Sequence, residues 1–211
     1  MRPDSLVAVR SEFSIEDPWR SPAGAEPARL RRSIDGGAPH LATTVAVYYD
    51  DHFLSILFSG ADDHLVASYR GHDDPLYDED VVEVFLAPRS IDEYYEMEVS
   101  PIGTMFDARI VSPDGSRRTM RADRSWDSGA FAAVRNVTER DGTMTVDTLL
   151  RVPFASLGAA APKEGESWRA NFFRIDRHPN RGDEYSAWRP TLLTPPDFHL
   201  TAAFGTLAFG A

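Results

Sequence analysis

The sequence predicts an all-β fold: a two-sheet antiparallel β-sandwich, of the jelly-roll or immunoglobulin-like kind, with one or two short helices. Three observations lead to this prediction. Short apolar runs recur along the chain, turn-forming residues separate them, and the i, i+3, i+4 pattern of long helices is missing. The chain has 211 residues, 42% of them hydrophobic, which is enough to bury one sizeable core. We therefore expect residues 1–211 to form a single domain, with residues 1–15 loosely attached or adding an edge strand.

The expected strands follow one another in chain order. Residues 45–49 are apolar, and a polar turn separates them from the apolar residues 53–58, which is the pattern of a tight hairpin. A meander comes next, and residues 101–103 form the turn between its last two strands. The strands expected after the hairpin are residues 81–86, 94–99, 104–111, 131–137, 143–150, 167–176 and 206–209.

Two short helical pieces are predicted outside these strands. Residues 27–33 contain Ala28, Leu30 and Arg31, which are compatible with a helix. Residues 152–157 have the length of a single helical turn. Neither piece is long enough to change the fold class.

Alternating side chains predict which residues face the core. Successive side chains of a strand point to opposite faces of its sheet, so the apolar alternate positions define an inward set. Two neighbouring strands and one late strand contribute to this set. Its members are Val82, Val84, Tyr95, Met97 and Phe172.

The same alternation gathers carboxylates on the opposite face. Glu83 lies there on one strand, and Glu96 and Glu98 lie there on the next, so a meander brings Glu83 near one of them. Adjacent carboxylates repel each other unless a cation or hydrogen-bond donors lie between them. Two interpretations stay open at this point. The carboxylates and Arg174 form a structural ion-pair network, or they hold the hydroxyl groups of a sugar through charge-assisted hydrogen bonds.

Composition excludes several partners and says little about the compartment. The net charge of −11 disfavours nucleic acid and anionic membrane surfaces, which require Lys and Arg. The chain has no cysteine and no apolar stretch of roughly 20 residues that would span a bilayer. Its first residues lack the pattern of a secretory signal, so we expect a cytoplasmic protein, or an extracellular or periplasmic one if a signal was removed.

Several motifs, in the order in which they occur, resemble the family 9 carbohydrate-binding modules. An aromatic residue precedes an acid-x-Val-Glu-x-Phe segment, and a Tyr-Tyr-Glu strand follows it. A strand with a central Asn, a Ser-x-Trp segment, and closing Phe-His and Phe-Gly-x-Leu segments come later. These matches are residues 77–85, 94–99, 168–173, 186–188, 198–199 and 204–207, so the resemblance covers about residues 43–209. Within this family, the chain is similar to the bacterial subgroup that shares Tyr-Tyr-Glu and Pro-Asp-Phe-His.

The resemblance implies a β-sandwich that holds a sugar between two aromatic rings, without catalysis. The two rings would be Tyr77 and Trp188, with Tyr77 standing where the family usually has Trp. Glu83 takes the position of a glutamate that bonds sugar hydroxyls, and Glu98 replaces an arginine. The other carbohydrate-binding residues that we predict are Asn171 and Arg174. The expected partner is a small sugar or the end of a polysaccharide chain.

The resemblance also implies structural calcium, which takes 6–8 oxygen ligands. The acidic residues before the Val-Glu strand are the predicted ligands, although they lack the spacing of a known calcium loop. These residues are Asp73, Asp74, Asp78 and Asp80.

Two other functions remain as alternatives to a binding module. Glu83 and Glu98 could serve as the carboxylate pair of a glycoside hydrolase, which requires a separation of about 5–5.5 or 6.5–9.5 Å. A haem or redox domain of the related DOMON-like sandwich type would use Met97 or Met105 with a histidine. A buried, purely structural Trp188 is also possible on the sequence alone.

Overall fold

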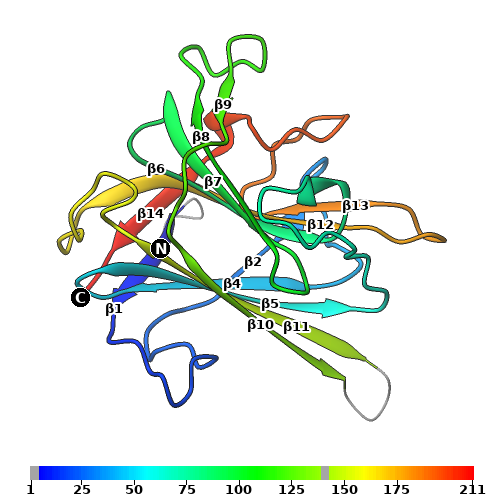
Figure 1. Ribbon diagram of the computed structural model, residues 1–211, viewed down its shortest axis with the longest axis horizontal. Helices are drawn as coiled ribbons and strands as arrows, with labels where there is room; N and C mark the ends of the chain where they lie inside the picture. Colours follow the sequence, from blue (N-terminus) through cyan, green and yellow to red (C-terminus); the bar gives the residue numbers. More distant parts are fainter. Residues whose placement is uncertain (1–4, 139–142) are drawn as a thin grey trace.

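The computed structural model describes residues 5–138 and 143–211 and is nearly all β (Figure 1). Two 3-10 helices are present in this part of the chain, η1 at Leu76–Asp78 and η2 at Thr201–Ala203. The strands are β1 Ser5–Arg10, β2 Ala28–Arg29, β3 Arg31–Arg32, β4 Thr43–Tyr49, β5 Phe53–Asp62, β6 Val81–Ser90, β7 Glu93–Val99, β8 Met105–Val111, β9 Arg121–Asp123, β10 Phe131–Thr138, β11 Met144–Pro153, β12 Ser167–Asp176, β13 Glu184–Ala187 and β14 Gly205–Phe209.

The strands form two sheets that pack face to face, as predicted for a β-sandwich. Sheet A has the order β14–β12–β6–β7–β8–β9, with β13 also paired to β12 and β3 paired to β13. Sheet B has the order β10–β11–β5–β4, with β2 paired to β4. All of these pairs are antiparallel.

Strand β1 joins the two sheets and is the exception to this antiparallel pattern. Its first residues pair in parallel with β14, and its last two, Val9 and Arg10, pair in parallel with β4. The prediction that residues 1–15 are loose or form an edge strand is therefore wrong for β1. The physical reason is burial, because Leu6 and Ala8 enter the core between the sheets and hold the strand there.

The core between the sheets, which we call the inter-sheet core, contains the inward set predicted from alternation. Val84, Tyr95, Met97 and Phe172 are buried in it, and Val82 packs against it. Their register explains this arrangement, since Val84 lies opposite both Met97 of β7 and Phe172 of β12. The period-2 prediction is confirmed for these strands.

The outer face of sheet A is also apolar over much of its area. Phe85, Tyr94 and Phe173 form its centre, with Phe85 and Tyr94 stacked at 5.5 Å between ring centroids. Connecting segments cover this outer cluster, and two of their side chains are Phe198 and Phe204. Because these connections cover the outer face only in part, they leave a cavity above the sheet.

The two predicted helical pieces are wrong. Residues 27–33 contain β2 and β3, because the exposed edges of β4 and β13 supply hydrogen-bond partners that override helix propensity. Val152 and Pro153 end β11, and the chain then makes a turn closed by a hydrogen bond from Leu157 N to Phe154 O. No helix within the described residues has the length and apolar character needed to cross a membrane.

Candidate functional site

A cavity of about 360 Å³ lies on the outer face of sheet A, within the usual size range of ligand sites. Its wall combines aromatic rings, carboxylates and guanidinium groups. The lining residues are Tyr77, Glu83, Glu96, Phe106, Ile110, Arg117, Met120, Ala122, Arg124, Ile175, Tyr185, Pro196, Phe198 and His199.

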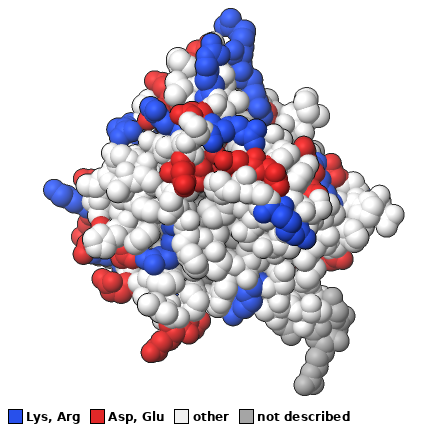
Figure 2. All heavy atoms as spheres, in the orientation of Figure 1, with Lys and Arg blue, Asp and Glu red and all other residues white. Residues whose placement is uncertain are grey.

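The cavity is assembled from segments far apart in the sequence. Strands β6 and β7 supply Glu83 and Glu96, and η1 supplies Tyr77, whose side chain is 41% exposed. Tyr185 comes from β13. The segment between β8 and β9 contributes Arg117, and Figure 2 shows basic side chains gathered at this end of the molecule, above a band of acidic ones.

Three buried glutamates form the base of the site, and we call Glu83, Glu96 and Glu98 the glutamate floor. Glu83 pairs with Glu98 across β6 and β7, and one carboxylate oxygen of each of the three lies within 4.8 Å of the others. Their exposed fractions are 2%, 6% and 0%. Glu83 and Glu96 line the cavity, whereas Glu98 does not, and apart from the Glu96 carboxyl no hydrogen-bond partner reaches the Glu98 oxygens among the described residues.

Burial is the main influence on the protonation of the glutamate floor. It raises the pKa of Glu96 to about 7, against an opposing effect of Arg117. Burial also raises the pKa of Glu83 and of Glu98 well above the ordinary value, and the neighbouring carboxylates raise both further. At neutral pH the floor therefore holds fewer than three negative charges unless a cation joins it.

His199 is the neighbour of the floor on the side of the outer cluster. Its Nδ1 lies 2.7 Å from the Tyr94 hydroxyl, and its Nε2 lies 3.7 Å from Glu96 Oε1. Burial lowers the pKa of His199 to about 4, so the imidazole is neutral at pH 7 and supplies no positive charge to the carboxylates.

The glutamate floor should make the free energy of unfolding fall as pH rises through neutrality. Because the folded-state pKa of Glu96 is raised from 4.5 to about 7, its stabilising contribution is fully present below pH 4.5 and is lost as pH rises through about 7. The lowered pKa of His199 makes stability rise with pH instead, but only below the ordinary histidine pKa of 6.5. Thermal melts in chelator from pH 6.5 to about 8.5 should therefore show a falling midpoint. The slope should flatten in Glu96→Gln, and a rising midpoint in wild type would contradict this assignment.

The structure places Tyr77 and Glu83 in the cavity wall, but the prediction that Trp188 is a ligand-facing ring is wrong. Trp188 is 7% exposed and belongs to the inter-sheet core, where its ring lies 5.7 Å from that of Phe172. The chain turns inward after Ala187, and the indole lies so close to Gly205 that any side chain there would overlap it.

Asn171 and Arg174 are also structural rather than cavity-lining. The Asn171 amide donates to the Arg189 carbonyl and accepts from the Arg189 N–H, each at 2.9 Å, so it fixes the chain after β13. Arg174 is on the inner face of β12 and donates to Ala61 O at 2.6 Å and to Asp62 Oδ2 at 2.7 Å. The prediction that these two side chains bind sugar hydroxyls is wrong, because their donors are occupied within the fold.

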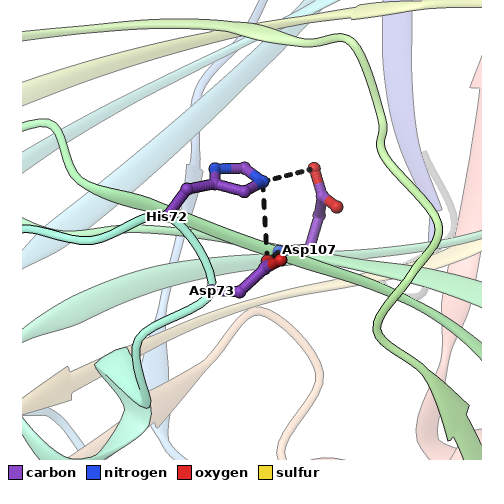
Figure 3. A group of neighbouring side chains, drawn as sticks. All are labelled: His72, Asp73 and Asp107. Carbon is purple, nitrogen blue, oxygen red and sulfur yellow. Dashed lines mark hydrogen bonds and ion pairs between the residues drawn. The ribbon is translucent and has the colours of Figure 1, made fainter.

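The four predicted calcium ligands do not form one cluster. Asp74 accepts a hydrogen bond from Gly71 N at 2.7 Å, and Asp78 is exposed on η1. Asp80 is buried and accepts from two backbone N–H groups. Asp73 lies elsewhere, 3.5 Å from the imidazole of His72 (Figure 3). Calcium binding itself stays a prediction.

Two other groups of acidic residues differ in how well they would suit a cation. His72, Asp73 and Asp107 face one another in Figure 3, and Asp107 Oδ1 has no hydrogen-bond partner in the described part of the chain. The buried carboxylates of Asp62, Asp80 and Asp176 also lie within 4.8 Å of one another. Arg174 contacts two of these three, so a guanidinium already occupies the place of a cation.

Sequence reasoning missed several residues of the cavity. Tyr185 was detectable in principle, because it alternates with Ala187 on a strand whose outer face the neighbouring β12 defines. Arg117, Arg124 and Phe198 lie in or beside connections, where no periodicity indicates the direction of a side chain. Glu96 was placed on the correct face but was not selected as a site residue.

A second cavity, of about 370 Å³, lies on the outer face of sheet B and has a different character. Its aromatic residue is Trp19, and the guanidinium of Arg135 lies 4.9 Å from the centre of that ring. Arg135 is in turn paired with Asp147 at 2.5 Å. Since the guanidinium covers the ring, the cavity on sheet A is the better candidate site.

Comparisons with known proteins agree with the fold and with the motif resemblance. None of the curated proteins matches the chain. A candidate carbohydrate-binding protein from Bacteroides uniformis ATCC 8492 has a similar structure, with a TM-score of 0.73 and 18% identity over 98% of this chain and 99% of that one. A family 9 module from Caldicellulosiruptor kristjanssonii, solved with cellotriose, is similar with a TM-score of 0.63 and 13% identity, over 98% of this chain and 94% of the module. The structure of a family 9 module from the same organism with glucose has a TM-score of 0.63 and 14% identity, over 98% of this chain and 96% of that one.

The family model agrees with these structural neighbours. It matches residues 36–209, which include β4 to β14 and so every strand that lines the cavity. The chain therefore belongs to carbohydrate-binding family 9.

Proposed function

We propose that the protein binds a carbohydrate, without transforming it, in the cavity on the outer face of sheet A. The observation that carries this proposal is the exposed ring of Tyr77 beside the buried carboxylates of Glu83 and Glu96. A flat ring can stack on the apolar face of a pyranose, and carboxylates accept strong hydrogen bonds from its hydroxyl groups. Family membership supports this proposal, as do the cellotriose and glucose bound by the C. kristjanssonii module.

The second ring of the site is Tyr185 in this proposal, in place of Trp188. Both Tyr77 and Tyr185 line the cavity. Arg177 links their segments, because it donates to the Tyr77 carbonyl and to the Tyr185 hydroxyl, each at 2.6 Å. This guanidinium fixes the position of the two rings before a ligand arrives, which lowers the entropic cost of binding.

Two observations favour binding over hydrolysis or haem chemistry. Glu98 is fully buried and pairs with Glu83 on the same face of sheet A, so these carboxylates cannot flank a glycosidic bond from two sides as a hydrolase requires. Met97 lies in the inter-sheet core and Met105 packs against it, so neither methionine faces the cavity.

Replacing Tyr77 by alanine should weaken sugar binding about tenfold or more, since burial of an aromatic face contributes about 1–3 kcal/mol. Isothermal titration with cellotriose and glucose is the measurement. Phe131→Ala is the matched control, because Phe131 is 57% exposed on β10 of sheet B and should leave affinity unchanged. Equal affinities of wild type and Tyr77→Ala would remove Tyr77 from the site. Failure of the wild type to bind any glycan on a broad array would overturn the proposed function.

A further inference from the structure

The two buried groups of three carboxylates in the described residues are compensated differently. In the group of Asp62, Asp80 and Asp176, Arg174 lies 2.7 Å from Asp62, and Arg181 lies 2.8 Å from Asp176. The glutamate floor shows no such contact. Among the described residues, the basic side chain that contacts it is the imidazole of His199, 3.7 Å from Glu96.

The arginines that line the cavity are engaged elsewhere. The guanidinium of Arg117 contacts Asp197 at 3.0 Å. That of Arg124 lies 4.9 Å from the ring of Phe106 and donates to the carbonyl of Asp73 at 2.6 Å. Both arginines influence the floor at a distance, but within the described residues neither is seen to make an ion pair with a floor carboxylate. Apart from the neighbouring carboxyl of Glu96, no hydrogen-bond donor reaches either oxygen of Glu98 in the part of the chain that the structure describes.

We propose that Glu83, Glu96 and Glu98 bind a hard divalent cation at the base of the cavity, and that hydroxyl oxygens of the carbohydrate complete its coordination. The cation site differs from the acidic segment before β6 that the sequence suggested for calcium. The part of this inference that concerns the sugar rests on the proposed function, whereas the part that concerns the metal does not.

The spacing and chemistry of the oxygens support a metal ion. Oxygen ligands lie 2.3–2.6 Å from Ca²⁺, so two of them on opposite sides are about 5 Å apart. One oxygen from each glutamate falls within a span of 4.8 Å, which is compatible with a single ion among them. A set made only of carboxylates selects calcium, magnesium or manganese over softer metals, which prefer imidazole or thiolate.

The position of Glu98 favours a metal ion over the ammonium group of an amino sugar. Glu98 is fully buried and does not line the cavity, so a group attached to a bulky pyranose cannot reach it. A bare ion can sit between Glu98 and the two glutamates above it. Since Glu83 and Glu96 form part of the cavity wall, the remaining coordination positions of such an ion face the space where a sugar would lie.

Direct titration tests the metal site. The probe is CaCl₂, titrated calorimetrically into chelator-stripped protein with no sugar present, and MgCl₂ and MnCl₂ are run in parallel. Wild type should bind at least one of these ions and melt at a higher temperature in its presence, because the ion binds only the native state. Glu98→Gln and Glu96→Gln should each lose that binding, because each removes a ligand of the ion. Both variants should stay folded, because neither leaves a new charge buried.

A matched variant locates the ion. Asp73→Asn alters the group in Figure 3 and leaves the glutamate floor intact, so its metal affinity should equal that of wild type. Wild type that binds none of the three ions would overturn the inference. Unchanged metal affinity in both glutamine variants would overturn it as well, and so would loss of binding in Asp73→Asn alone.

A second arm separates this inference from the proposed function. Binding of cellotriose or glucose is measured in the preferred ion and again in chelator, and we expect it to be lost in chelator. Sugar binding that is unaffected by chelator would overturn the bridging role and leave the proposed function standing. A metal-binding protein that recognises no glycan on an array would keep the metal site and overturn the carbohydrate function.

Discussion

Replacing Trp188 by alanine is expected to destabilise the fold by about 3–5 kcal/mol, the usual cost of truncating a large buried aromatic residue. The indole packs in the inter-sheet core beside Phe172 and lies against the backbone of Gly205. Its removal leaves a cavity between the sheets that Gly205, which has no side chain, cannot fill. Chemical denaturation followed by fluorescence and circular dichroism measures the loss.

Trp19→Ala is the control for this substitution. Trp19 lies under Arg135 at the surface of sheet B, and its truncation should cost much less. A Trp188→Ala variant with wild-type stability and no sugar binding would contradict the structural assignment. It would restore Trp188 as a ring that contacts the ligand.

Replacing Arg174 by alanine should destabilise the protein by a similar amount, about 3–5 kcal/mol, because it leaves the buried carboxylate of Asp62 without its cation. The guanidinium lies 2.7 Å from Asp62 and 3.3 Å from Asp176, and both carboxylates are almost fully buried. The same denaturation experiment measures the effect. The loss should shrink as pH falls, because burial raises the pKa of Asp62 and its protonation removes the uncompensated charge.

An exposed ion pair provides the control for Arg174. Arg118 is 85% exposed and lies 3.8 Å from Asp114, so Arg118→Ala should change stability by no more than about 1 kcal/mol. An Arg174→Ala variant as stable as Arg118→Ala would show that the buried aspartates need no cation. It would also remove the contrast with the glutamate floor on which the metal inference depends.

The strands that form the base of the site were predictable because they obey a strict period of two. Val84 and Met97 had to face the core, so Glu83 and Glu98 had to face the other way and pair across the two strands. Trp188 shows where this reasoning ends. It follows the last residue of β13, and beyond a strand end the alternation no longer determines on which side of the sheet a ring lies.

Other features depended on contacts that the local sequence does not contain. Residues 27–33 favour a helix only until the edges of β4 and β13 are present to pair with them. Arg117 reaches the cavity from a connection, where it contacts Asp197, a residue far along the chain. The aspartates before β6 looked like one acidic cluster, but the backbone directs Asp80 inward and Asp78 outward.

The parallel pairing of β1 with β14 has a consequence for how the chain reaches this fold. It joins residues 5–8 to residues 206–209, so closure of the two sheets must wait for nearly the whole chain to leave the ribosome. Until then, β1 and the first residues of β12, which both pair with β14, each present an unpaired edge that another nascent chain could extend. Contacts of such long range slow folding, and the incomplete sandwich is therefore the state most exposed to aggregation during synthesis.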